Sequence, residues 1–162
     1  MALSYLFTMR GIPQLFYGTE LALTSPPQRD DGKVRADFPG GWAGDKVNAF
    51  TGAGLTDTQR MAQQLVSRLL NWRKTASAIH QGKLMHFAPD RGTYTYFRYN
   101  EQQTVMVVLN KQPHPVTLEL ARFRQVLPAG VQATEVLTGA KLQLKQQLTV
   151  PARGVLVLDI KP

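Results

Sequence analysis

The sequence predicts a mixed fold in which an α/β part is followed by an all-β antiparallel module. Up to about residue 81, apolar residues recur at helical spacing or in one short buried run. From residue 82 onwards, seven or so short strand-like runs alternate with turn residues, which is typical of an antiparallel sandwich or barrel. We therefore expect two domains, residues 1–81 and residues 82–162.

The composition is that of a folded globular protein. The chain has 162 residues, of which 43% are hydrophobic and 19% are charged, and these proportions argue against wholesale disorder. The absence of cysteine excludes disulfides and thiolate metal sites. No apolar run approaches the roughly 20 residues that span a bilayer, so we expect a soluble protein without a membrane span.

The charge is positive but dispersed. The formal net charge is +8, and residues 58–162 hold fourteen Lys and Arg against five Asp and Glu. Apart from the adjacent Arg73 and Lys74 and the close pair Arg122 and Arg124, the basic residues are scattered singly, without the Lys/Arg-rich run that indicates a nucleic-acid patch. A solvated basic surface is therefore the preferred interpretation, and nucleic acid is not an expected partner.

The first 20 residues predict a helix, a buried strand and a turn that presents one carboxylate. Apolar residues in 1–8 have helical spacing, and Gly11 is a natural residue to end the helix. The short apolar run 14–17 lacks alternation, as expected for a strand covered on both faces. Glu20 would then lie at the carboxyl edge of that strand, where α/β folds bind ligands. A structural hydrogen bond or ion pair is the alternative role for this carboxylate.

Residues 21–55 predict a long ordered loop with a candidate binding segment. The segment is rich in Gly and Pro but contains large aromatic residues, which purely solvated linkers rarely contain. Arg35 and Asp37 offer directional hydrogen bonds to hydroxyl groups, and Trp42 offers a flat apolar face for the C–H side of a sugar ring. Alternatively, Arg35 and Asp37 pair within the loop and Trp42 anchors it.

A strong helix signal covers residues 58–74. Thr56 and Gln59 have the spacing of a capping box at its start. An apolar stripe then recurs at helical intervals, and we expect it to face the core rather than a cofactor or a membrane. The stripe consists of Met61, Leu65, Leu69 and Trp72.

The C-terminal half predicts strands separated by turn residues. The expected strands are 83–88, 93–99, 104–109, 116–121, 134–137, 141–150 in one or two pieces, and 154–160. Tyr94 and Tyr96 share one strand face, which either stacks a ligand or is an ordinary strand surface. The histidines, at positions 80, 86 and 114, lack metal-ligand spacing, so we expect no metal site and no cofactor.

The decapeptide Gly11-Ile12-Pro13-Gln14-Leu15-Phe16-Tyr17-Gly18-Thr19-Glu20 closely resembles the α-amylase family of glycoside hydrolases at the eighth strand of its catalytic barrel. The loop 37–42, the helix end 69–74 and the all-β tail follow the order seen in the neopullulanase and cyclomaltodextrinase group. The resemblance implies the last βα repeat of a (β/α)8 barrel, with strand, long loop and helix, followed by a C-terminal β-sandwich. It also implies that the chain is the C-terminal part of a larger enzyme.

The function implied by the resemblance is retaining hydrolysis of α-glucans. In such enzymes two carboxylates lie about 5–5.5 Å apart, and the family takes them from earlier strands. The family's Asn-His-Asp segment is also missing from this sequence. We therefore expect no catalytic residue here and no activity from this chain alone.

The resemblance also supplies substrate-binding candidates, which would act only in the full-length parent. Tyr17 and Glu20 would line or buttress the barrel mouth, and Arg35 resembles a loop arginine near the donor-side subsites. Asp37 and Trp42, chosen from their residue types, complete the set of candidates. The expected partner is an α-glucan or a maltooligosaccharide, and calcium stays open for the parent enzyme.

The sequence leaves other interpretations of the function open. A freestanding β-sandwich that binds a glycan or a protein is the main alternative, and a basic nucleic-acid-binding β domain is the third. We further expect residues 1–55 either to be poorly ordered in isolation or to bury their apolar surface by self-association. The linkage cleaved, the chain-length preference and the compartment, periplasm or cytoplasm, stay undetermined.

Overall fold

The computed structural model describes residues 1–25, 27–28 and 30–161. Contacts divide it into two compact units, which we name the β unit (residues 1–13 and 68–162) and the loop unit (residues 14–67). The strands begin at Lys83, next to the expected domain boundary at residue 82. The division into domains 1–81 and 82–162 stays a prediction. The two compact units are divided differently, because residues 1–13 contact the strands.

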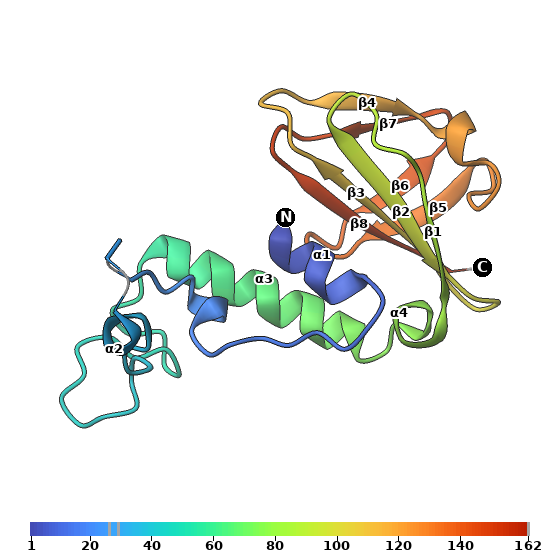
Figure 1. The fold of residues 1–162 in the computed structure, drawn as a ribbon. Helices are drawn as coiled ribbons and strands as arrows, with labels where there is room; N and C mark the ends of the chain where they lie inside the picture. Colours follow the sequence, from blue (N-terminus) through green and yellow to red (C-terminus); the bar gives the residue numbers. More distant parts are fainter. Residues whose placement is uncertain (26, 29, 162) are drawn as a thin grey trace. The chain divides into compact units, whose positions relative to one another are not determined.

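The β unit is an antiparallel two-sheet structure, which confirms the predicted sandwich-like C-terminal domain (Figure 1). The larger sheet has the order β1-β2-β3-β8-β5-β6, and the smaller one pairs β4 with β7. The strands in the described residues are β1 Lys83–His86, β2 Thr93–Tyr99, β3 Thr104–Asn110, β4 Val116–Glu119, β5 Val131–Glu135, β6 Lys141–Leu144, β7 Gln147–Val150 and β8 Val155–Ile160.

The main core lies between the two sheets. Phe97, Met106 and Leu158 of the larger sheet are fully buried in it. Leu118 of the smaller sheet faces them, because β4 alternates buried and exposed residues. The 3-10 helix η2 Leu120–Phe123 replaces the end of the strand that we predicted over 116–121, and it turns Phe123 into this core.

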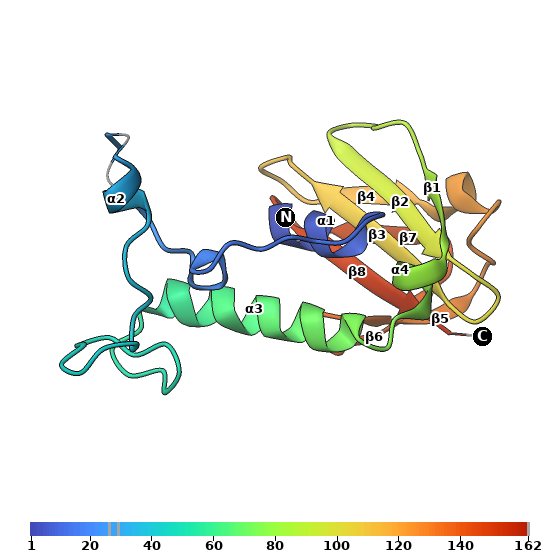
Figure 2. The same cartoon turned by 60° about the horizontal axis from the view of Figure 1, so that its bottom comes forward.

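The other face of the larger sheet is covered by helix α1 Ala2–Thr8 (Figure 2). Tyr96 on β2 is completely buried there, with its hydroxyl 2.5 Å from that of Thr8 and its ring 5.9 Å from that of Tyr5. Burial raises the pKa of the Tyr96 phenol. Since Tyr96 is buried by a helix, the possibility that its strand face stacks a ligand is excluded at this residue.

Two arginines bind the C-terminal end of α1. Arg73 donates to the carbonyl oxygen of Phe7 at 2.7 Å, and Arg98 donates to that of Thr8 at 3.4 Å. Helix ends leave such carbonyls without intrahelical partners and carry partial negative charge, so both guanidinium groups are well placed. Burial lowers the pKa of both arginines. The helix ends at Thr8, which corrects the predicted end at Gly11.

Further contacts tie the remaining helices of the β unit to the sheet. The indole of Trp72, near the end of α3 Asp57–Arg73, donates to Asp159 on β8 at 2.9 Å. Gln103 also donates to Asp159, and its side-chain oxygen accepts from the backbone of Ala78 in α4 Ser77–Gln81. One carboxylate therefore connects two helices to the sheet.

The loop unit contains no strand at residues 14–17, so the strand predicted there is wrong for this structure. A strand requires a hydrogen-bonded neighbour, and no other strand lies beside this segment in the described residues. The unit instead contains η1 Thr19–Leu21, α2 Asp31–Val34 and the first part of α3. Its small core consists of Leu21, Ala49 and Leu55, with Phe38 and Val47 packed against them.

Helix α3 confirms the predicted capping box. The backbone N–H of Thr56 donates to Gln59 Oε1 at 2.9 Å, and that of Gln59 donates to Thr56 Oγ1 at 3.3 Å. The apolar stripe is only partly buried, since Leu69 is fully buried whereas Met61 is 63% exposed. The prediction that the whole stripe faces a core is therefore wrong at Met61.

Candidate functional site

The candidate binding residues all lie in the loop unit, and a glycine turn organises the first two. Gly18 has φ +83°, and a Cβ there would lie 2.5 Å from Leu23 Cδ1, so only glycine fits without rearrangement. The turn leads into η1, which buries Leu21 and carries Glu20. Tyr17, directly before the turn, is 43% exposed.

Glu20 is half-buried, and its Oε2 atom is buried without a hydrogen-bond partner among the described residues. Buried polar atoms are nearly always paired, so this oxygen is an unusual feature of the turn. The carboxylate lies in a 3-10 turn rather than at the end of a paired strand. The prediction that Glu20 lies at the edge of a sheet is therefore wrong for this structure.

Tyr17 is connected to the segment that holds Arg35 and Asp37. Its hydroxyl donates to the carbonyl oxygen of Ala36, between those two residues, at 3.1 Å. A hollow of about 240 Å³ lies beside this contact, lined by residues of 16–25 and 33–36, including Tyr17. Arg35 and Asp37 are exposed and form no ion pair within the described residues. Their functional groups are therefore available to a ligand.

Trp42 is presented to solvent by a hydrogen-bonded turn. Asp45 accepts hydrogen bonds from the backbone N–H groups of Gly40 at 2.8 Å and Trp42 at 3.1 Å. Gly40 has φ +97°, and a Cβ there would lie 2.7 Å from Asn48. The Trp42 side chain is 67% exposed, so it does not anchor the loop. No hydrogen bond or ring contact joins it to the other four candidates in the part of the chain that the structure describes.

Two residues that hold turns of this loop, Asp45 and Asn48, were not among the predicted candidates. Asp45 holds the turn described above, and Asn48 accepts from the backbone N–H groups of Phe50 and Thr51 at 2.9 and 3.0 Å. Phe50 is 75% exposed, with its ring 5.4 Å from that of Phe38. Asn and Asp commonly form such local turns, and that tendency was the available signal.

The candidate residues offer hydrogen-bonding groups and one exposed aromatic face. A phenol, a guanidinium, a carboxylate and an exposed indole are the groups that recognise sugar hydroxyls and C–H faces. In the described ranges, no three His, Asp or Glu side chains gather where they would hold a metal ion. No helix in the described part of the chain has the length and apolar character that crossing a bilayer requires.

A comparison with known protein families finds a match over the C-terminal strands. Residues 84–159 match the family model of the cyclomaltodextrinase C-terminal domain. The chain is related to the C-terminal part of the α-amylase-family glycoside hydrolases. A relative in sequence is the 4-alpha-glucanotransferase of Thermotoga maritima, 27% identical over 139 residues, which cover 76% of this chain and 32% of the relative.

Solved structures of α-amylases share the fold of this chain over nearly its whole length. The α-amylase of Geobacillus thermoleovorans, solved in complex with acarbose, is 18% identical with a TM-score of 0.74 over 99% of this chain and 32% of its own. AmyP, solved in complex with maltotriose, is also 18% identical, with a TM-score of 0.71 over 98% and 33% of the two chains. The chain thus spans about a third of the length of these relatives.

Proposed function

We propose that this chain is the C-terminal part of a retaining glycoside hydrolase that acts on α-glucans. The observation that carries the proposal is the match of residues 84–159 to a cyclomaltodextrinase C-terminal domain, together with fold similarity over 99% of the chain to an α-amylase. In this proposal the loop unit binds part of the sugar chain. The β unit is structural and performs no chemistry.

The chain's own residues bind and orient the substrate. Arg35 donates hydrogen bonds to sugar hydroxyls, and Asp37 accepts them. The indole of Trp42 packs on the C–H face of a glucose ring and excludes water from it. Tyr17 holds the backbone at Ala36 through its hydroxyl and thereby positions Arg35 and Asp37 on either side.

The chain alone is not expected to hydrolyse α-glucans. Retaining hydrolysis requires a nucleophilic carboxylate and an acid–base carboxylate about 5–5.5 Å apart across the scissile bond. Two of the loop-unit carboxylates are engaged elsewhere, since Asp45 holds the Trp42 turn and Glu20 lies half-buried in η1. Incubation of the purified chain with maltotriose should therefore release no glucose, and reproducible release would contradict this part of the proposal.

Tryptophan fluorescence tests the binding role, because the chain has only two tryptophans. Trp42 is 67% exposed, whereas Trp72 is half-buried and hydrogen-bonded to Asp159. In a Trp72→Phe variant, titration with maltotriose should shift or quench the emission of Trp42 saturably. The matched Trp42→Phe variant should show no change on the same titration.

The two variants separate the proposed site from the alternatives. A response of Trp72 but not of Trp42 would place the sugar on the β unit and favour a freestanding glycan-binding module. No response in either variant, even at high maltotriose concentration, would remove the binding role assigned to Trp42.

A further inference from the structure

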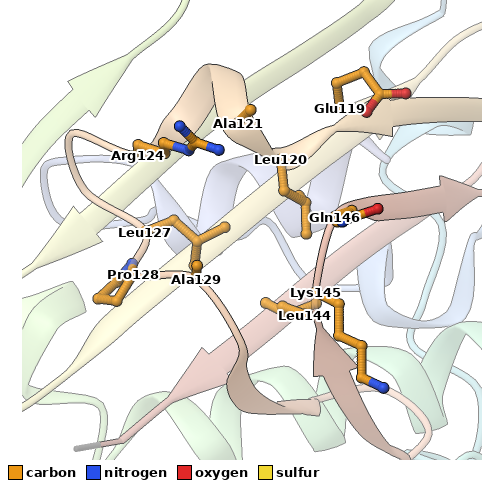
Figure 3. Close-up of a pocket in the computed structure, with 10 residues that line it drawn as sticks. All are labelled: Glu119, Leu120, Ala121, Arg124, Leu127, Pro128, Ala129, Leu144, Lys145 and Gln146. Atoms are coloured by element: carbon orange, nitrogen blue, oxygen red, sulfur yellow. The ribbon is translucent and has the colours of Figure 1, made fainter.

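The hollow in the β unit offers little surface to a ligand (Figure 3). It lies beside η2 and the turn between β6 and β7, with Arg124 at its rim. Leu120, Leu127 and Leu144 point toward its centre, but they are only 4%, 3% and 2% exposed and belong to the core between the sheets. The loop unit differs, because its Trp42 is both exposed and held by a hydrogen-bonded turn.

The Trp42 turn is fixed to residues 48–55, which we name the support segment and which lie between the turn and α3. The backbone N–H of Ala49 donates to the carbonyl oxygen of Pro39, at the start of the turn, at 3.0 Å. A Cβ added at Gly40 would lie only 2.9 Å from a Cα atom of the support segment, so the two backbones are in close contact. The position of the turn therefore depends on where the support segment is held.

Two side chains of α3 hold the support segment. Arg60 donates from Nη1 to the carbonyl oxygen of Gly52 at 2.7 Å and from Nη2 to that of Leu55 at 2.6 Å. Gln63 donates from Nε2 to the carbonyl oxygen of Ala49 at 3.0 Å. Residues three apart lie on the same face of a helix, so one face of α3 supplies all three hydrogen bonds. The contacts thus run from α3 through the support segment to the turn.

Arg60 acts on the loop through directional hydrogen bonds rather than through its charge. Its ion pair with Asp57 spans 4.0 Å, and the Asp57 side chain is 99% exposed, so solvent screens the pair. The two hydrogen bonds to carbonyl oxygens use the planar fork of the guanidinium. Lysine carries the same charge on a single flexible ammonium and lacks this fork, so it is not an equivalent residue here.

We propose that Arg60 and Gln63 are positioning residues that hold Trp42 ready for a sugar and do not contact the sugar themselves. The inference rests on the function proposed for Trp42. A loop that is ordered before the ligand arrives loses less conformational entropy on binding, so it binds more tightly than a mobile loop. The core of the loop unit is small, so the hydrogen bonds from α3 supply much of this order.

Fluorescence anisotropy of Trp42 tests the positioning without a ligand, in the full chain with Trp72→Phe, where Trp42 is the one remaining tryptophan. Arg60→Met and Gln63→Met should each make the local motion of the indole faster. Gln64→Met is the matched control, because Gln64 is exposed and makes no side-chain hydrogen bond among the described residues. It should leave the anisotropy decay unchanged.

Titration with maltotriose in the same background is the second measurement. The dissociation constant should rise by about tenfold in Arg60→Met, which loses two hydrogen bonds, and by about threefold in Gln63→Met, which loses one. Emission at saturation should match that of the unsubstituted background, since the sugar still reaches the same indole. Arg60→Lys should bind as weakly as Arg60→Met, and Gln64→Met should bind normally.

The inference is overturned if either the indole motion or the dissociation constant is the same in both Arg60→Met and Gln63→Met as in Gln64→Met. It is also overturned if Arg60→Lys binds maltotriose normally, because charge rather than the hydrogen-bonding fork would then matter. If Arg60→Met unfolds the loop unit, Gln63→Met decides alone. Binding that persists equally in all variants removes the positioning role alone, whereas a Trp42 that never responds to maltotriose removes the proposed function and this inference together.

Discussion

Different interactions stabilise the β unit and the loop unit, each within itself. In the β unit, a core such as that around Phe97 and Leu158 lies between two sheets, and α1 covers the outer face of the larger one. In the loop unit, three residues form the buried core, and side chains bonded to backbone hold the turns. Much of the exposed large apolar surface accordingly lies in the loop unit, at Phe16, Trp42, Phe50 and Met61 among others.

The difference indicates a division of labour. A unit with an extensive core tolerates little change and supplies stability. A unit with a small core and locally bonded turns presents exposed side chains, which agrees with the binding role proposed for the loop unit. The following changes break or sharpen this contrast, from the largest expected effect to the smallest.

Phe97→Ala should have the largest effect. The ring is completely buried between the sheets, and deleting it should lower the free energy of unfolding by about 3–5 kcal/mol. Leu55→Ala, in the core of the loop unit, is the matched comparison, and its effect on the strands should be much smaller. Denaturant unfolding followed by strand circular dichroism measures both, and equal effects would contradict the contrast.

Arg98→Met should be the next most damaging. Arg98 is only 2% exposed and donates to the carbonyl oxygens of Thr8 and Gly82, so its loss leaves two largely buried acceptors unpaired. We expect a loss of about 2–3 kcal/mol in the free energy of unfolding. Arg153→Met, at an exposed position, should change it by less than about 0.5 kcal/mol. If Arg98→Met lowered the free energy of unfolding as little as Arg153→Met does, α1 would not depend on Arg98.

Stability of the β unit should fall as pH rises above 10. Burial raises the pKa of Tyr96 above its ordinary value near 10, so the unfolded chain releases this proton first. Above pH 10 the unfolded state therefore binds fewer protons than the folded state, and the free energy of unfolding falls by up to about 1.4 kcal/mol per pH unit. Urea unfolding between pH 9 and 11 measures this slope.

Tyr96→Phe is the control for that pH dependence. The variant loses the hydrogen bond to Thr8, so it should be less stable at pH 7 by about 1 kcal/mol. Its slope between pH 10 and 11 should be clearly smaller, with burial of Tyr94 accounting for a small remainder. An unchanged slope would show that another group carries the effect.

Thr56→Ala should have the smallest and most local effect. It removes the side-chain acceptor for the Gln59 N–H at the start of α3, which is worth about 1 kcal/mol. Amide exchange should accelerate in the first turn of α3 and stay unchanged in β2 and β3. Faster exchange in those strands would mean that the loop unit stabilises the β unit after all.

Local patterns in the sequence were sufficient for much of the fold. The run 93–99 is a strand with the predicted bounds, and the capping box of Thr56 and Gln59 forms as expected. Alternating apolar residues and turn residues are local patterns that involve only neighbouring positions. They therefore predict these elements without tertiary information. The exposed candidate Asp37 was chosen from residue type, and Arg35 from residue type and a family resemblance, and their role in sugar binding stays a prediction.

Only the tertiary structure decided which surfaces are covered. Residues 14–17 have the composition of a buried strand but lack a neighbouring strand, and pairing depends on residues distant in sequence. Tyr96 is buried because α1, some 90 residues earlier, packs on it, and no local pattern contains that contact. The hollow below Arg124 likewise depends on a turn near residue 145 meeting η2. The sequence by itself determined most of the elements of the β unit and their order, whereas long-range packing decided which segments pair as strands and which side chains are buried.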